Sequence, residues 1–263
     1  MTTNLESSSK EEIKEVLEDA LQDGQISQGS HDLICGNLNN NIVAGSNGMA
    51  LDDIESSAVT LITLVIDKSS SIDFSGLTKE IIDGQAVIVE ALKGTKKKEE
   101  ILISAWLFND DTEVLNSYIP VDDVEDLKAI YRPTGGTRLY DTAFEALSAN
   151  VTYAQKLRAN GTPTQSIVVI LTDGEDTTSH KHSPADVATL AKDLLKSETF
   201  VLAYVGVGSD DHDTISKSMG FPAFLKSGAT PSEVRALLKL VSQSLVKQST
   251  TQITDQSNNA FFN

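Results

Sequence analysis

The sequence predicts an α/β protein built on a doubly wound, mostly parallel sheet, and it does so by three observations. Short apolar runs recur along the chain, stretches with helical spacing separate them, and helix-start signals precede several of these stretches. The runs are 59-VTLITLVI-66, 101-ILISAWLF-108, 167-IVVIL-171 and 199-TFVLAYVGV-207. Runs that are almost wholly apolar are typical of strands buried on both faces, as in a parallel sheet covered by helices.

The stretches between these runs carry apolar residues at helical spacing. The three sets are Phe74, Leu77, Ile81, Ile88 and Leu92; Phe144, Leu147, Val151 and Ala154; and Val234, Leu237, Leu238, Val241 and Leu245. Thr230-Pro231-Ser232-Glu233 is a capping box with Pro at the first helical position, and Ser183-Pro184-Ala185-Asp186 is a similar start. Alternating strands and helices indicate helices on both faces of the sheet.

One further strand is expected at an edge of the sheet. The segment 112-TEVLNSYIP-120 follows the preceding apolar run after only three residues, 109–111. Such a short link suits an antiparallel hairpin and is too short for a parallel crossover. The predicted fold is therefore Rossmann-like, with one antiparallel edge strand.

The chain divides into three parts by composition. Residues 57–248 hold the α/β pattern. Residues 1–56 are predicted to form a small acidic helical appendage and linker: 11–23 read as an amphipathic helix, and 24–48 are rich in Gly, Asn and Ser. Residues 249–263 are polar and nearly uncharged, and we expect a disordered tail.

Charge and cysteine content restrict the class of function. The formal net charge is -17, which disfavours nucleic acid and anionic membrane surfaces as partners. The single cysteine, Cys35, allows no intrachain disulfide and has no cationic helper nearby in the sequence. The N-terminus lacks the pattern of a secretory signal, and no stretch is apolar enough to span a membrane. We therefore expect a cytoplasmic protein.

Three polar clusters follow strands of the predicted sheet, where ligands bind in open α/β folds. They are 67-DKSSS-71, the Gly-rich 134-TGGTRLYDTA-143 and 171-LTDGEDTT-178. Alternate spacing in the first cluster directs Asp67, Ser69 and Ser71 inward and Lys68 and Ser70 away. Carboxylate and hydroxyl oxygens without histidine or cysteine suit a hard divalent cation, magnesium first, with manganese or calcium as alternatives.

These three clusters, in this order, resemble the metal-ion-dependent adhesion site of the von Willebrand factor A (vWA) domain. The resemblance covers roughly residues 57–247 and implies that the metal ligands are Asp67, Ser69, Ser71, Thr137 and Asp173. It also implies a partner carboxylate that completes the coordination. Ser70 stands where the family often has Gly. The motif 135-GGTRLYD-141 resembles the corresponding motif of intracellular microbial members of the family. Such members often work beside ATPases of the MoxR type (AAA+).

The sequence thus predicts a non-catalytic module that uses a divalent cation to bind an acidic residue of a protein partner. One alternative is a metal-dependent phosphohydrolase with Asp67 as nucleophile, although Ser69 replaces the second carboxylate typical of such enzymes. Another is an assembly subunit whose metal site is merely stabilising and whose contacts come from residues 1–56. Helix capping is an alternative explanation for Asp67, Ser69 and Ser71, because Ser and Asp are favoured at helix starts. Asp141 and Asp176 are candidates for supporting roles, and His180, His182 and His212 are expected as solvated loop residues.

Overall fold

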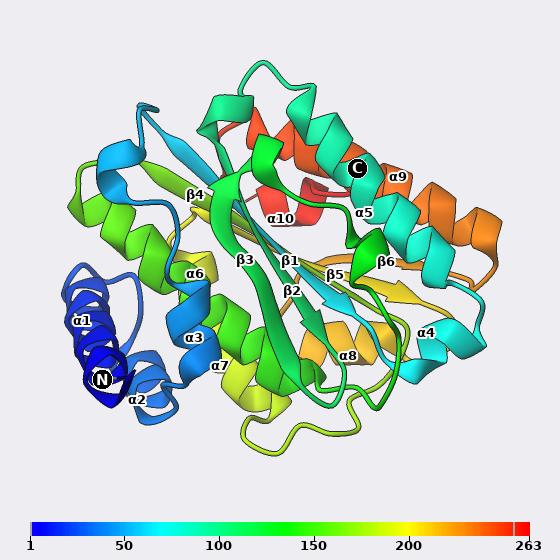
Figure 1. Cartoon of the computed structure of the whole chain (residues 1–263), viewed down its shortest axis with the longest axis horizontal. Helices are drawn as coiled ribbons and strands as arrows, with labels where there is room; N and C mark the ends of the chain where they lie inside the picture. Colours follow the sequence, from blue (N-terminus) through cyan, green and yellow to red (C-terminus); the bar gives the residue numbers. More distant parts are fainter. Residues whose placement is uncertain (1, 255) are drawn as a thin grey trace.

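The computed structural model of the chain describes residues 2–254 and 256–263 and contains a six-stranded sheet (Figure 1). The strand order is β3-β2-β1-β4-β5-β6. The strands are β1 (Val59–Asp67), β2 (Ile101–Phe108), β3 (Thr112–Pro120), β4 (Thr164–Thr172), β5 (Phe200–Val207) and β6 (Ala223–Ser227). All neighbours pair in parallel except β2 and β3, which form the antiparallel hairpin. The predicted fold class is confirmed.

Helices cover both faces of this sheet. The helices of the described residues are α1 (Thr2–Gln22), α2 (Gln28–Gly36), α3 (Asn40–Gly45), α4 (Ser70–Phe74), α5 (Thr78–Lys93), α6 (Leu139–Ala159), α7 (Pro184–Lys196), α8 (His212–Ser218), α9 (Pro231–Ser249) and α10 (Ser257–Ala260). Short 3-10 turns are η1 (Leu51–Asp53), η2 (Lys98–Glu100), η3 (Val121–Asp123) and η4 (Leu127–Ala129). Apolar residues of α5 and α9 pack on one face, and those of α6 and α7 pack on the other. In the described part of the chain, no helix is both long and apolar enough to cross a membrane.

The N-terminal helices form an outer layer over α6 (Figure 1). Ser27 caps α2 by accepting from the Ser30 amide, and Asn39 caps α3 by accepting from the Asn41 and Ile42 amides. The Gly-, Asn- and Ser-rich stretch predicted as a linker therefore holds two capped helices. Ser and Asn disfavour helix interiors but are preferred at helix starts, which composition alone does not distinguish.

The described part of the C-terminal tail also packs on the domain, which differs from the disordered tail that its composition predicts. The Asn258 side chain accepts from the Leu202 amide at 2.9 Å and donates to the Phe200 carbonyl at 2.8 Å. Phe261 is buried in the same core as α9. Since β6 pairs only with residues 203–207 of β5, Asn258 satisfies the backbone edge of β5 that β6 leaves uncovered.

Two further differences concern single elements. Strand β6 has no clear signal in the sequence, because it is five residues long, carries a lysine and is only partly buried. Phe74 was placed on the apolar side of a helix with Leu77 and Ile81, and that placement is wrong. It ends the separate short helix α4 and is 88% exposed, because Gly76, at φ +67°, turns the chain before α5 begins.

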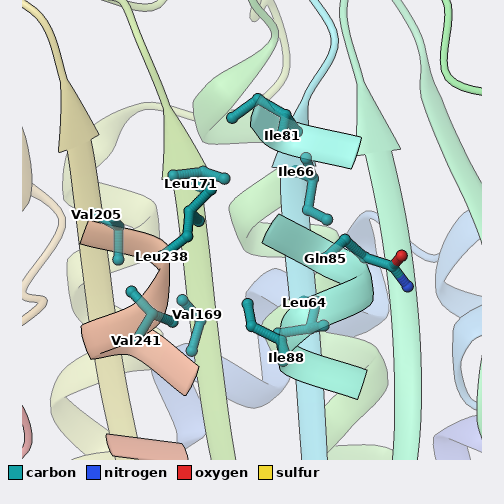
Figure 2. Close-up of a pocket in the computed structure, with 10 residues that line it drawn as sticks. All are labelled: Leu64, Ile66, Ile81, Gln85, Ile88, Val169, Leu171, Val205, Leu238 and Val241. Carbon is teal, nitrogen blue, oxygen red and sulfur yellow. The ribbon is translucent and has the colours of Figure 1, made fainter. Parts of the chain in front are cut away.

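A small cavity lies between the sheet and the helices α5 and α9 (Figure 2). Its volume is about 20 Å³, and its lining is aliphatic except for Gln85, whose amide points away from the other lining side chains. Space of this size holds about one water molecule. The cavity is a packing gap in the core and offers no room for an organic ligand.

Candidate metal centre

The register between β1 and β4 places Asp67 beside Thr172 at the carboxyl edge of the sheet. Ile66 pairs with Leu171, so the next residue of each strand emerges side by side. The Thr172 hydroxyl donates to Asp67 Oδ2 at 2.6 Å, and the Ser69 amide donates to Asp67 Oδ1 at 2.7 Å. Both carboxylate oxygens of Asp67 are therefore held in place by neutral donors.

The hydroxyls of the first loop extend this cluster to Asp173. Ser69 Oγ lies 3.0 Å from Ser71 Oγ, and Ser71 Oγ donates to Asp173 Oδ1 at 2.8 Å. Four of the five predicted ligands, Asp67, Ser69, Ser71 and Asp173, thus belong to one hydrogen-bonded group, which Asp67 joins through the Ser69 amide. Inward-facing side chains at alternate positions produce this arrangement, as their spacing predicts.

The two carboxylates of the cluster are poorly solvated. Burial raises the pKa of Asp67 to about 7, against hydrogen bonds from Ser69 and Thr172 that lower it. Burial likewise raises the pKa of Asp173. Within the described residues, no Lys, Arg or His side chain forms an ion pair with either group. When Asp67 and Asp173 are ionised, no cationic side chain of the described residues forms an ion pair that compensates their charge.

Thr137, the fifth predicted ligand, lies in the neighbouring loop and is buried. Its amide donates to Thr177 Oγ1 at 2.8 Å, and its carbonyl accepts from the amides of Thr177 and Thr178. Among the residues that the structure describes, its side chain forms no hydrogen bond with the other four. The structure thus fixes the backbone of Thr137 against the loop that carries Asp173, and its hydroxyl forms no hydrogen bond within the described residues.

Ser70 joins the first loop to the Gly-rich loop. Its hydroxyl donates to the Gly135 carbonyl at 2.9 Å, and its amide donates to the same carbonyl at 3.1 Å. Lys68 pairs with Glu113 of β3. Both side chains therefore have partners outside the oxygen cluster, which agrees with the outward directions expected for positions 68 and 70.

Replacing Ser70 with alanine should weaken this connection between loops. We expect the free energy of unfolding to fall by about 1 kcal/mol, because one hydrogen bond is lost and the Gly135 carbonyl keeps only the amide donor. Urea denaturation measures the change. The exposed Ser209 provides the control, since Ser209→Ala should leave stability unaltered. Equal stabilities of the two variants would contradict the assigned role.

Asp141 anchors the long loop that follows β4. Its carboxylate is fully buried and accepts from the amides of His180, Lys181 and His182 and from Arg138 Nε. Burial alone raises its pKa, but these donors outweigh burial and hold the pKa well below its usual range. A side chain considered for a supporting role thereby fixes the 180–182 segment to the start of α6. Asp176 also supports α6, accepting from the Tyr140 amide at 3.3 Å.

Two histidines expected in solvent are buried, which corrects that interpretation. The His182 ring stacks on Phe144 with centroids 3.9 Å apart. His212 contacts the Tyr204 hydroxyl and the Val207 carbonyl, each at 3.0 Å. His180 is exposed, as expected. Polar sequence neighbours concealed the burial, because His182 packs on a helix 38 residues earlier and His212 folds back onto the strand that precedes it.

Two residues that were not predicted from the sequence, Thr172 and Asp110, also position the site. Thr172 binds Asp67 directly, and its place immediately before Asp173 at the end of a strand is the signal that was available. Asp110 accepts from the Gly136 amide at 2.9 Å. A Cβ at Gly136 would meet Thr177, Thr178 and Asp110 within 3.0 Å, so this close approach requires glycine.

The chemistry of the donor set fits a hard divalent cation. Two carboxylates and the hydroxyls of Ser69 and Ser71 converge, and a buried carboxylate whose pKa is raised gains most from an adjacent cation. Asp67, Ser69, Ser71, Thr137 and Asp173 would hold the ion, which would supply an electrophilic position for an external oxygen. In residues 2–254 and 256–263, no group of three or more His, Cys, Asp or Glu side chains could hold a metal. The candidate site has only two carboxylates and relies on hydroxyls for the rest.

Comparison with known families agrees with the predicted fold. Residues 62–252 match the von Willebrand factor type A domain, so the chain belongs to this family. No curated protein sequence matches the chain.

Solved structures with a similar fold include a matrix protein, a pilus adhesin and a minor pilin. Proximal thread matrix protein 1 from the mussel byssus has 18% identity and a TM-score of 0.51, covering 74% of this chain and 47% of that protein. The pilus adhesin SpaC of Lactobacillus rhamnosus GG has 14% identity and a TM-score of 0.55, covering 73% and 31%. A D319A mutant of the PilB minor pilin from Streptococcus sanguinis has 9% identity and a TM-score of 0.50, covering 74% and 63%. The chain thus spans less than two thirds of each, and identities this low establish the fold alone.

Proposed function

We propose that the chain is a non-catalytic protein-interaction module that binds a divalent cation and, through it, a carboxylate of a protein partner. Asp67, Ser69, Ser71, Thr137 and Asp173 are its ligands, and magnesium is the ion we favour, with manganese or calcium as alternatives. One observation carries the proposal. The buried Asp67 carboxylate is bonded to the Ser69 amide, and the Ser69 and Ser71 hydroxyls continue the hydrogen-bonded group to Asp173 at the carboxyl edge of the sheet, where open α/β folds bind ligands.

Two carboxylates only just balance a divalent charge, which leaves the ion electrophilic toward a third carboxylate from outside. A MoxR-type AAA+ ATPase is our candidate for the partner, and the cytoplasm our candidate compartment. Both rest on the family resemblance and on composition.

The phosphohydrolase alternative is disfavoured by the surroundings of Asp67. A nucleophile must reach its substrate, yet Asp67 is 1% exposed and both its oxygens accept hydrogen bonds. Ser69 occupies the position where such enzymes carry their second carboxylate. We therefore propose no catalytic residue.

Calorimetric titration with MgCl₂ and MnCl₂ tests the metal site. We expect the wild-type chain to release or absorb heat in a saturable transition and Asp67→Ala to show none, because the central carboxylate is lost. Asp52→Ala, an exposed acid on η1, is the matched control and should bind as the wild type does. Binding by Asp67→Ala equal to that of the wild type would show that the site is wrongly assigned.

A further inference from the structure

Phe74 is the most exposed of the large hydrophobic side chains in the described part of the chain, and it lies on the same short helix as Ser71 of the candidate metal centre. It is 88% exposed, against 48% for Val87 and 46% for Ile130. Single exposed apolar residues are common on protein surfaces, so exposure alone gives Phe74 no role. Its position relative to the oxygen cluster gives it one.

Ser71 and Phe74 lie three residues apart on the same short helix, α4 (Ser70–Phe74). Residues at this spacing share one face of a helix, with Cβ atoms roughly 5–6 Å apart. The Ser71 hydroxyl faces Asp173 in the oxygen cluster. A carboxylate bound at the proposed ion would therefore bring its neighbouring residues within reach of the Phe74 ring.

The exposure of Phe74 is fixed by its surroundings. Between Ser71 and Phe74, Ile72 is buried and its carbonyl accepts from the Leu77 amide at 2.9 Å. The Asp73 carboxylate accepts from Thr78 Oγ1 at 2.9 Å, which ties α4 to the start of α5. The helix is thus held from both sides with its aromatic side chain directed to solvent.

The loops at this edge of the sheet carry an excess of acidic side chains. These are Asp73, Asp110, Asp111, Asp173, Glu175, Asp176, Asp210 and Asp211. Three basic side chains lie near these loops: Lys68 and Arg138 are paired with Glu113 and Asp141, and Lys226 donates to the Asp210 carbonyl at 2.9 Å. A divalent ion offsets only part of this charge, so a partner with several acids is repelled and one with basic flanks is attracted.

From this geometry we infer that the partner is a protein segment with a single carboxylate, an aromatic or large aliphatic side chain directly beside it, and basic residues further along. This inference rests on the proposed function, since the carboxylate is the group that binds the ion. Phe74 determines the preference for the apolar neighbour, and the acidic loops determine the preference for basic flanks.

Three synthetic peptides test the inference by fluorescence polarisation with the full chain in MgCl₂. They are Arg-Gly-Phe-Asp-Phe-Gly-Arg, the same peptide with Ser for both Phe, and the same peptide with Glu for both Arg. We expect the first to bind roughly tenfold more tightly than either other peptide, as aromatic contacts and charge complementarity of this size allow. Phe74→Ser should abolish the advantage of Phe over Ser, whereas Val87→Ser should retain it.

The outcomes separate the two proposals. Magnesium-dependent binding that is equal for the Phe and Ser peptides, or a Phe preference that survives in Phe74→Ser, overturns the role of Phe74 and leaves the proposed function standing. Equal binding of the Arg and Glu peptides overturns the preference for basic flanks. If no peptide binds the wild-type chain in a chelator-sensitive way, the proposed function itself fails, and the inference fails with it.

Discussion

Replacing Asp67 with asparagine should make the metal-free chain more stable at pH 8, while abolishing its stabilisation by magnesium. Most buried-site substitutions destabilise a protein, so an increase is a distinctive outcome. The reason is that the folded chain must keep a carboxylate ionised where burial opposes the charge. Asparagine has nearly the same shape, accepts from the Ser69 amide through its carbonyl, and carries no charge.

The direction of the pH dependence follows from the two pKa values. The carboxyl has its ordinary pKa of 3.8 when the chain is unfolded and a pKa of about 7 when it is folded and metal-free. The unfolded chain therefore releases this proton first as pH rises, and the stability of the folded state falls between about pH 4 and pH 7. A difference of this size corresponds to about 4 kcal/mol at most. Asp67→Asn lacks this pH-dependent loss of stability. Its free energy of unfolding should therefore exceed that of the wild type most at pH 8, and the two should not differ for this reason near pH 4.

Magnesium should reverse the order of stability at pH 8. It stabilises the wild-type chain by binding the ionised carboxylate of the folded state, and this effect should weaken at pH 5, where Asp67 is protonated. Urea denaturation of both chains at pH 5 and pH 8, with magnesium and with a chelator, measures all four differences. Asp52→Asn, an exposed acid, should behave as the wild type. A metal-free Asp67→Asn chain that is no more stable at pH 8 than the wild type would contradict this account.

The sequence permits prediction of the oxygen cluster because short-range patterns determine it. Alternation after β1 separates Ser69 and Ser71 from Ser70, and a parallel register brings the ends of β1 and β4 together. The same logic fails for Asp141, since nothing near position 141 reveals that a segment about 40 residues later donates three amides to it. Thr137 is an intermediate case. Its loop lies beside the loop that carries Asp173, but in the described part of the chain its hydroxyl forms no hydrogen bond with the cluster.

The N-terminal layer was the hardest part to predict because its role depends on a surface elsewhere in the chain. An amphipathic helix followed by a polar stretch is also what a flexible appendage looks like. Its partner surface is the outer side of α6, whose polar residues give little hint of burial. Glu145 is fully buried there and accepts from the side-chain amides of Asn39 and Asn41 at 2.7 and 2.8 Å. Asp193 on α7 similarly accepts from the Ser27 amide and the Ser30 hydroxyl.

Deleting residues 1–56 should therefore prevent stable folding of the remainder. The layer buries five large aliphatic side chains, Ile13, Leu17, Ile26, Ile34 and Ile42. At about 2 kcal/mol each, their loss approaches about 10 kcal/mol, which is comparable to the whole stability of a typical domain. The deletion also leaves the Glu145 carboxylate without its two amide donors. We expect the truncated chain to aggregate on size-exclusion chromatography and to lack a cooperative unfolding transition.

Point substitutions distinguish a loss of packing from a loss of chain length. Leu17→Ala should lower the free energy of unfolding by about 2–5 kcal/mol because the side chain is fully buried in the core that α1 shares with α6 and α7. Leu240→Ala, at a partly exposed position on α9, is the matched control and should cost far less. If residues 57–263 alone form a monomer that unfolds cooperatively at the wild-type midpoint, the N-terminal layer is a dispensable appendage. It would then be free to make the contacts that the assembly-subunit alternative requires.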